Sequence, residues 1–135
     1  MIYNYTRRVP YYETDMMGIV HHSNYIRYFE CGRSDMMAKV GLPIDAIEKA
    51  GVMLPIVAVE CKYRRPALMG DRIRIVSMID TLPTAKLVVN SEIYNQKDEL
   101  LCKGSVTLGF LDAATRRPIR CPKDLVAVIE KHMNL

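Results

Sequence analysis

Apolar and bulky side chains between residues 22 and 40 recur every three or four positions, which is the spacing of one helix face. This pattern, with one small residue in its middle, consists of Tyr25, Phe29, Gly32, Met36 and Val40. Gly41 and Pro43 follow it and mark the end of the predicted helix. Because glycine lowers helix stability by about 1 kcal/mol relative to alanine, Gly32 predicts a point where the helix backbone lies close against a sheet.

Other patterns on either side of this helix predict strands. Residues 2–12 read as a tyrosine-rich strand with Pro10 near its end, where proline is tolerated. After a short helix near residues 44–50, we expect four more strands and a terminal helix, at residues 53–65, 72–81, 84–95, 99–112 and 122–133. Short polar, glycine or proline segments separate the last three strands, which predicts an antiparallel meander. The whole order predicts one α+β domain over residues 1–135, with a curved sheet wrapped around the long helix.

The composition narrows the possible classes of function. Half of the 135 residues are hydrophobic and a quarter are charged, which is typical of one globular domain. No apolar run approaches the roughly 20 residues that cross a bilayer. The first residues also lack a secretory-signal pattern, so we expect a cytoplasmic protein without a membrane span. The net charge of +4 is mild and the basic residues are spread out, which makes nucleic-acid binding the weakest hypothesis.

The four cysteines lie far apart in the chain and form no C-x-x-C pair. We therefore expect reduced thiols and no metal site. Cys31, in the predicted long helix, stays open as a nucleophile, although its neighbours in the sequence include no evident base.

The residues best suited to chemistry gather between Tyr11 and Glu30, in YYETDMMGIVHHSNYIRYFE. Asp15 lies in a turn before Gly18, and His22 stands at the start of the predicted long helix. A helix start offers unpaired N–H groups and the positive end of a dipole, which suit a developing oxyanion. An aspartate beside such a site can act as a general base or as a nucleophile.

Each residue of this segment also has a structural interpretation. Asp15 can cap backbone N–H groups of its own turn, and Glu13, although it could add a second carboxylate, is expected to be a solvated turn residue. His22 can position a reactant or pack locally, and His21 is the weaker candidate of the pair. Adjacent histidines on a helix point in different directions, which argues against a metal site. Tyr25 is expected to pack in the core with its hydroxyl hydrogen-bonded.

Two motifs resemble a known family. The first, D-x-x-G-[IV]-V-x-H-x-x-Y opening a long helix, is carried by Asp15, Gly18, Val20, His22, Asn24 and Tyr25. The second is the run from Val59 to Ala67 followed by Gly70-Asp71. Together with the meander, over residues 3–112, they resemble the hotdog fold, in the 4-hydroxybenzoyl-CoA thioesterase branch that includes the YbgC-like acyl-CoA thioesterases. Met16 and Met17 depart from the family, where small residues or proline are common, and bring the shape of the acyl pocket into question.

The resemblance implies hydrolysis of acyl-CoA thioesters without a cofactor. Asp15 would be the general base or nucleophile, and His22 is the second catalytic candidate. The backbone N–H of His22 or a neighbour would hold the oxyanion, which is worth roughly 3–4 kcal/mol in the transition state. The remaining substrate or oxyanion candidates are Gly18, Val20 and Tyr25. The family also implies a site between two subunits, so that a homodimer is the minimal active unit and a homotetramer is expected.

The planar guanidinium of arginine donates hydrogen bonds in pairs, which suits the phosphates of coenzyme A. The basic candidates for this role are Arg64, Arg65, Lys103, Arg116 and Arg117. Two other functions stay open. One is a hotdog dehydratase, although dehydratases favour a different histidine signature. The other is a non-catalytic protein that binds acyl-CoA or acyl-carrier protein, which would have no need of Asp15.

Overall fold

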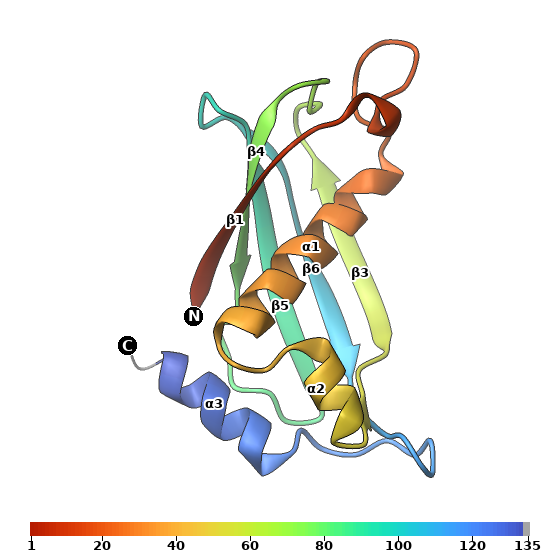
Figure 1. Ribbon diagram of the computed structural model, residues 1–135, viewed down its shortest axis with the longest axis vertical. Helices are drawn as coiled ribbons and strands as arrows, with labels where there is room; N and C mark the ends of the chain where they lie inside the picture. Colours follow the sequence, from red (N-terminus) through yellow and green to blue (C-terminus); the bar gives the residue numbers. More distant parts are fainter. Residues whose placement is uncertain (134–135) are drawn as a thin grey trace.

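The computed structural model describes residues 1–133 and contains one main sheet with a long helix across it (Figure 1). The strands are β1 (Ile2–Arg8), β2 (Val52–Met53), β3 (Ile56–Tyr63), β4 (Arg72–Met78), β5 (Lys86–Tyr94), β6 (Leu100–Gly109) and β7 (Leu111–Asp112). The helices are the 3-10 turn η1 (Tyr11–Glu13), α1 (Ser23–Lys39), α2 (Ile44–Lys49) and α3 (Lys123–Met133). The predicted α+β class and the long helix are confirmed.

The main sheet is antiparallel and has the order β1-β4-β5-β6-β3. β4, β5 and β6 follow one another as hairpins, so the predicted meander is confirmed. β3 pairs with β6 at one edge, and β1 pairs with β4 at the other. Two edges of the sheet are therefore open, and β3 is the edge nearer the second motif.

The core lies between α1 and the sheet. Along β5, buried side chains alternate with half-buried ones, which is the pattern of a sheet with one face on the core. A Cβ added to Gly32 would lie 2.6 Å from Ile75 Cγ2 and 2.7 Å from Ser77 Oγ of β4. The predicted close approach at Gly32 is thereby confirmed, and any larger residue there would push the helix away from the sheet.

All five predicted strands are shorter than expected, and for three of them the structure shows why. The first ends at Arg8, because the chain passes through Val9 and Pro10 into the 3-10 turn η1. The strand expected at 53–65 breaks at Leu54-Pro55 into β2 and β3, since proline cannot donate to a ladder. The strand expected at 99–112 breaks at Phe110, and its last part, β7, leaves the main sheet to pair with β2.

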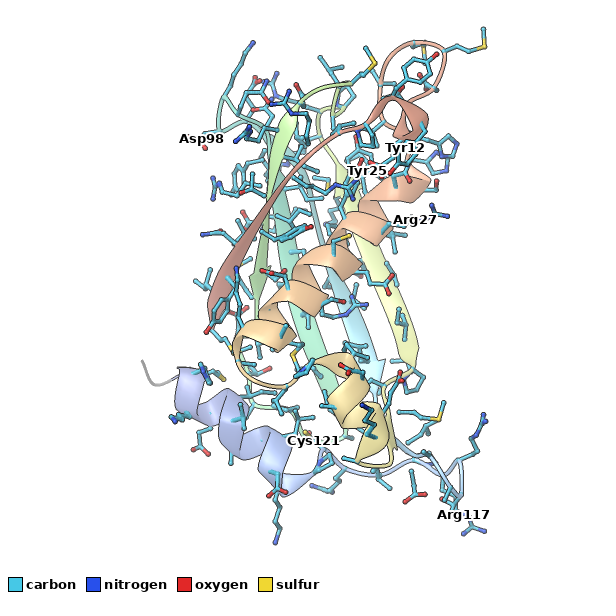
Figure 2. All side chains as sticks on the ribbon, viewed as in Figure 1. Tyr12, Tyr25, Arg27, Asp98, Arg117 and Cys121 are labelled. Carbon is cyan, nitrogen blue, oxygen red and sulfur yellow. The ribbon has the colours of Figure 1, made fainter. Side chains whose placement is uncertain are left out.

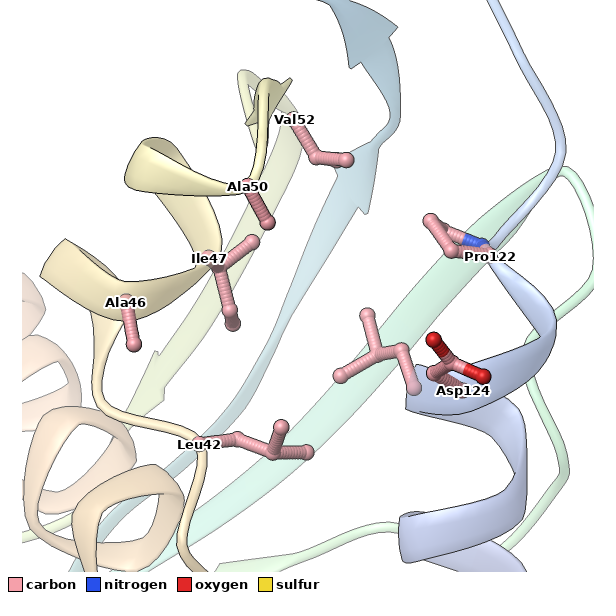
Figure 3. A pocket seen from close by; sticks show the side chains of 8 residues that line it. Leu42, Ala46, Ile47, Ala50, Val52, Pro122 and Asp124 are labelled. Carbon is pink, nitrogen blue, oxygen red and sulfur yellow. The ribbon is translucent and has the colours of Figure 1, made fainter.

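The two ends of α1 carry different kinds of structure. Tyr12 and Tyr25 lie at the end where α1 begins, while Arg117 and Cys121 lie at the opposite end (Figure 2). Between α2 and α3 is an apolar pocket of about 240 Å³ in which Asp124 is the one charged lining residue (Figure 3). Among residues 1–133, no helix is long and apolar enough to cross a membrane.

Candidate active site

Asp15 lies in a small closed turn between η1 and α1. An antiparallel bridge joins Thr14 to Val20, and the Asp15 N–H donates to the Ile19 carbonyl at 2.8 Å. Gly18 has a φ of +76°, a conformation that favours glycine and closes the turn. Asp15 Oδ1 accepts the Met17 N–H at 2.8 Å, so the aspartate does cap its own turn. Its Oδ2 accepts no hydrogen bond from any residue between Met1 and Met133, and the side chain is half-buried.

The backbone N–H groups around the start of α1 are mostly occupied. The N–H groups of Gly18 and Val20 donate to the carbonyls of Asp15 and Ala67, at 3.1 Å and 2.8 Å. The N–H of Ser23 donates to the His21 ring at 3.3 Å, and that of Asn24 to the His21 carbonyl at 3.0 Å. Among the amides of residues 18–24, these contacts leave those of Ile19 and His22 without an acceptor in the described part of the chain.

Of these two, only the backbone N–H of His22 lies at the start of α1, so it is the candidate oxyanion donor. His22 occupies the N-cap position of α1, at the positive end of the helix dipole. Its ring is exposed and lies 4.2 Å, centroid to centroid, from the ring of His21. The position therefore combines a free donor with a helix start.

A hollow of about 310 Å³ has His22 in its wall. It is lined by Ile19, Val20, His22, Tyr25, Tyr63, Arg64, Arg65 and Pro66. Tyr25 is buried, and its hydroxyl accepts the Ala67 N–H at 2.9 Å, which confirms the structural role expected for it. The hollow thus brings the first motif together with the second, although Asp15 is not among its lining residues.

Tyr63 is a site residue to which the sequence analysis gave no role. Its hydroxyl donates to the His22 carbonyl at 3.1 Å, and its ring stands edge-on to Tyr25 at 5.2 Å. Partial desolvation of the hydroxyl and the neighbouring Cys61 thiol raise the pKa of Tyr63 to about 12. The neutral phenol is thus a donor over the physiological pH range and ties β3 to the start of α1. Its place in the second motif was the one sequence signal for this contact.

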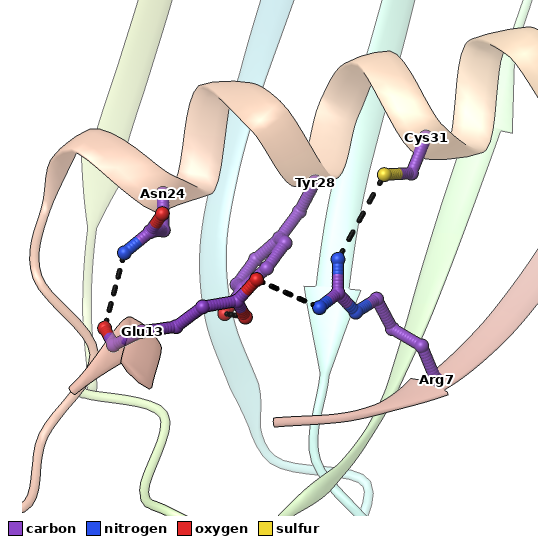
Figure 4. Close-up of polar contacts among 5 residues, drawn as sticks. All are labelled: Arg7, Glu13, Asn24, Tyr28 and Cys31. Carbon is purple, nitrogen blue, oxygen red and sulfur yellow. Dashed lines mark hydrogen bonds and ion pairs between the residues drawn. The ribbon is translucent and has the colours of Figure 1, made fainter. Parts of the chain in front are cut away.

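The expectation that Glu13 is solvated is wrong. Its carboxylate accepts the Tyr28 hydroxyl at 2.6 Å and forms an ion pair with Arg7 at 2.8 Å (Figure 4). Tyr28 is fully buried, so a carboxylate beside it is held by its partners and not by water. The Glu13 backbone carbonyl accepts the Asn24 side-chain amide at 3.0 Å, which gives Asn24 the structural role that its burial suggests.

The five basic candidates for the phosphates of coenzyme A lie in three places. Arg64 and Arg65 line the hollow, and Arg65 also pairs with Glu99 at 3.2 Å. Lys103 on β6 lines a separate hollow with Glu60 and Lys62. Arg116 and Arg117 follow β7 at the opposite end of the molecule, where Figure 2 labels Arg117. Within one subunit, only the first pair lies beside the motif residues.

The two methionines that depart from the family motif are fully or largely exposed at the tip of the turn. Neither Met16 nor Met17 lines the hollow beside His22. Their effect on the shape of an acyl pocket therefore stays a prediction.

Comparison with known proteins places this fold in a thioester-cleaving class of protein. The profile of the thioesterase-like superfamily matches residues 9–129, and the chain belongs to that superfamily. YneP of Bacillus subtilis (strain 168) is 33% identical over 115 residues, which cover 85% of this chain and 83% of the relative. The acyl-CoA thioester hydrolase YbgC of Escherichia coli O6:H1 is 26% identical over 126 residues, 93% of this chain and 94% of YbgC.

The chain is also similar to solved structures. A DHNA-CoA thioesterase from Staphylococcus aureus superposes with a TM-score of 0.91 and 27% identity, covering 99% of this chain and 92% of that one. The hotdog fold and the family predicted from the two motifs are thereby confirmed.

Proposed function

We propose that this protein hydrolyses acyl-CoA thioesters to a free acid and coenzyme A. The observation that carries the proposal is the unoccupied N–H of His22, at a helix start, beside a hollow lined by two arginines. A thioester whose carbonyl oxygen accepted this N–H would have its developing negative charge stabilised as the tetrahedral intermediate forms. The activities named for the relatives support the same reaction.

Asp15 supplies the attacking group in this proposal. As a general base, Oδ2 removes a proton from water, the resulting hydroxide attacks the carbonyl carbon, and the C–S bond breaks to release the coenzyme A thiolate. As a nucleophile, Oδ2 attacks the carbonyl carbon itself, the thiolate leaves, and water then hydrolyses the mixed anhydride. Both routes give the same products, and both need the free oxygen that the Met17 contact leaves available.

The substrate's nucleotide end is assigned to Arg64 and Arg65. Both side chains are exposed at the hollow, where paired donors can meet a phosphate. An acyl group on a carrier protein also presents a phosphate, through its pantetheine arm, so these arginines serve either carrier. Lys103, Arg116 and Arg117 have no such position relative to the hollow of their own subunit.

The active unit in this proposal is a homodimer formed through β3, with a homotetramer as the expected full assembly. Ile56, Val57, Val59 and Tyr63 of this edge strand keep between 37% and 52% of their surface exposed. An open edge with exposed apolar side chains on both faces is well suited to pair with a second copy. Such pairing would add partner residues to the hollow near Tyr63 and so enclose the substrate.

A panel of acyl-CoA thioesters assayed for free thiol tests the function. The panel should include short, long and aromatic acyl groups, with the matching acyl-carrier-protein thioesters as a second series. The proposal predicts release of thiol and acid in equal amounts from at least one CoA series. Stoichiometric binding of a thioester without any thiol release would favour the non-catalytic binding protein instead.

A further inference from the structure

Glu13 is the point where the turn that holds Asp15 is attached to the rest of the subunit. Its backbone carbonyl accepts the His21 N–H at 3.1 Å and the Asn24 side chain at 3.0 Å. Its carboxylate binds Tyr28 of α1 through one oxygen and Arg7 of β1 through the other. Four donors from a strand, a helix and the turn itself therefore converge on one residue, and Figure 4 shows the three that belong to Arg7, Asn24 and Tyr28.

Glu13 lies close in the chain to both groups of the proposed reaction, Asp15 and the His22 N–H. Glu13 precedes Asp15 by two residues, and its partner His21 precedes His22 by one. The hydrogen bond between Glu13 and His21 joins the two ends of the turn. Asp15 lies inside this turn, and the His22 N–H follows directly after its last residue. Fixing Glu13 therefore fixes the distance and direction between the two groups to which the proposed hydrolysis is assigned.

The side-chain contacts of Glu13 are well suited to rigid support. The guanidinium of Arg7 lies 4.8 Å from the centre of the Tyr28 ring, so the ion pair is also stacked on the phenol that binds the same carboxylate. Arg7 Nη1 contacts Cys31 Sγ of α1 at 3.8 Å, which adds a second link to the helix. Charge-assisted hydrogen bonds of this kind are short and directional, and removing one partner leaves a poorly solvated charge behind.

We propose that Glu13 is a positioning residue for the reaction, acting through Arg7 and Tyr28 to hold Asp15 in register with the His22 N–H. The inference rests on the proposed hydrolysis by Asp15. Glu13 neither lines the hollow nor contacts the substrate in this account. Small errors in the placement of reacting groups reduce rates by up to about 10²-fold, so loss of this support should slow the chemical step without weakening substrate binding.

The test measures kcat and KM for Glu13→Gln and Tyr28→Phe with the best substrate of the panel. Glutamine keeps the size of Glu13 but loses the ion pair, and phenylalanine removes only the hydroxyl. Each variant should lower kcat roughly tenfold to a hundredfold with KM within about twofold of wild type. Asp35→Asn is the matched control, since Asp35 pairs with Lys39 at 2.7 Å on the same helix and has no contact with the turn. Its kcat should equal that of the wild type.

A positioning role is separated from simple loss of folded enzyme by repeating both variants in an Asp15→Asn background. If Glu13 acts by placing Asp15, Glu13→Gln should leave the residual rate of Asp15→Asn unchanged, whereas a smaller folded fraction would lower it further. Arg7→Lys should recover part of the kcat lost in Arg7→Met, because it restores the charge beside Glu13.

The outcomes distinguish this inference from the proposed function on which it rests. Wild-type kcat in Glu13→Gln and Tyr28→Phe, together with loss of activity in Asp15→Asn, would overturn the positioning role alone. Wild-type activity in Asp15→Asn itself would overturn the assignment of Asp15. Additive losses in the double variants would show that Glu13 only maintains the fold.

Discussion

The two ends of α1, about 25 Å apart for a helix of 17 residues, each lie beside a cavity, and the two cavities differ in their lining. At the C-terminal end, the pocket between α2 and α3 is apolar, with Asp124 as its one charged lining residue. At the N-terminal end, the hollow of about 310 Å³ is more open and has several polar groups at its wall. Only the second end combines a free backbone donor, a nearby carboxylate with an unused oxygen and two arginines.

This difference is the reason that the proposed chemistry is assigned to the N-terminal end of α1 and not to the apolar cavity. Leu42, Ile47 and Leu125 line the cavity at the first end, and an apolar wall of this kind would not stabilise a negative charge that develops during a reaction. At the second end, a network of hydrogen bonds through Glu13 and Tyr63 fixes polar groups in place. Preorganised polar groups of this kind are the main source of transition-state stabilisation.

Among changes that leave Asp15 in place, the largest effect is expected from removal of the oxyanion donor at the N-terminal end. His22 has a φ of −55°, close to the value that proline fixes, so His22→Pro deletes the N–H with little change of backbone. We expect kcat to fall about 10²–10³-fold. His22→Ala, which keeps the N–H and removes the ring, is the matched control. If steady-state assays gave both variants the same loss, the ring and not the amide would be responsible.

A substitution in the apolar pocket at the C-terminal end of α1 should lower the stability of the protein and leave its activity unchanged. Leu125 is buried against the α2–α3 pocket, so Leu125→Ala should lower the free energy of unfolding by about 2–3 kcal/mol. Denaturant titration measures this loss, and kcat of the folded variant at 25 °C should be unchanged. A large fall in kcat with normal stability would show that the apolar pocket contributes to the reaction.

A smaller effect is expected from the arginines at the hollow. Arg64→Ala should raise KM for a CoA thioester about tenfold, because one charge-assisted contact to phosphate is lost. The same acyl group on a short thiol without phosphates should show no change. Arg117→Ala, at the other end of the subunit, is the control and should match the wild type in both assays. Equal effects of the two arginines would indicate only a general attraction of the basic protein for anions.

The smallest effect concerns the pH dependence of stability. Burial and the Glu13 carboxylate raise the pKa of Tyr28 well above its usual value of 10. Above pH 10 the unfolded chain loses this proton while the folded chain keeps it, so the stabilisation, complete below pH 10, declines as pH rises. The stability advantage of wild type over Tyr28→Phe should therefore shrink by up to about 1.4 kcal/mol per pH unit. Thermal unfolding at pH 9 to 11 measures the difference in stability between the wild type and Tyr28→Phe. A difference that stayed constant over this range would contradict the prediction.

Much of the fold followed from the sequence because its signals are local. Helical spacing identified α1, a mid-helix glycine located its closest approach to β4, and turn residues marked the hairpins of β4, β5 and β6. Proline at positions 10 and 55 accounts for two of the strand boundaries, and a non-local effect accounts for a third. Phe110 ends β6 because β7 leaves to pair with β2, a contact between residues almost 60 positions apart that no local pattern reports.

The site was predicted less completely than the fold. The motif located Asp15, His22 and Tyr25, but Glu13 was expected to be solvated because a glutamate in a turn usually is. Its burial depends on Arg7 and Tyr28, which only the folded chain brings to it. The choice of the His22 amide over those of Gly18 and Val20 likewise depends on the acceptors that the last two find in the fold.

The most direct test of the central claim, that Asp15 in the turn before α1 performs the reaction, is the single-turnover rate of thioester cleavage by Asp15→Asn. The asparagine side-chain oxygen can still accept the Met17 N–H, so the turn keeps its cap and loses only the carboxylate. Asp124→Asn, which removes the carboxylate at the other end, is measured beside it. The account predicts a fall of about 10²–10⁴-fold for Asp15→Asn and the wild-type rate for Asp124→Asn. A wild-type rate for Asp15→Asn would contradict the account and reduce Asp15 to a structural cap.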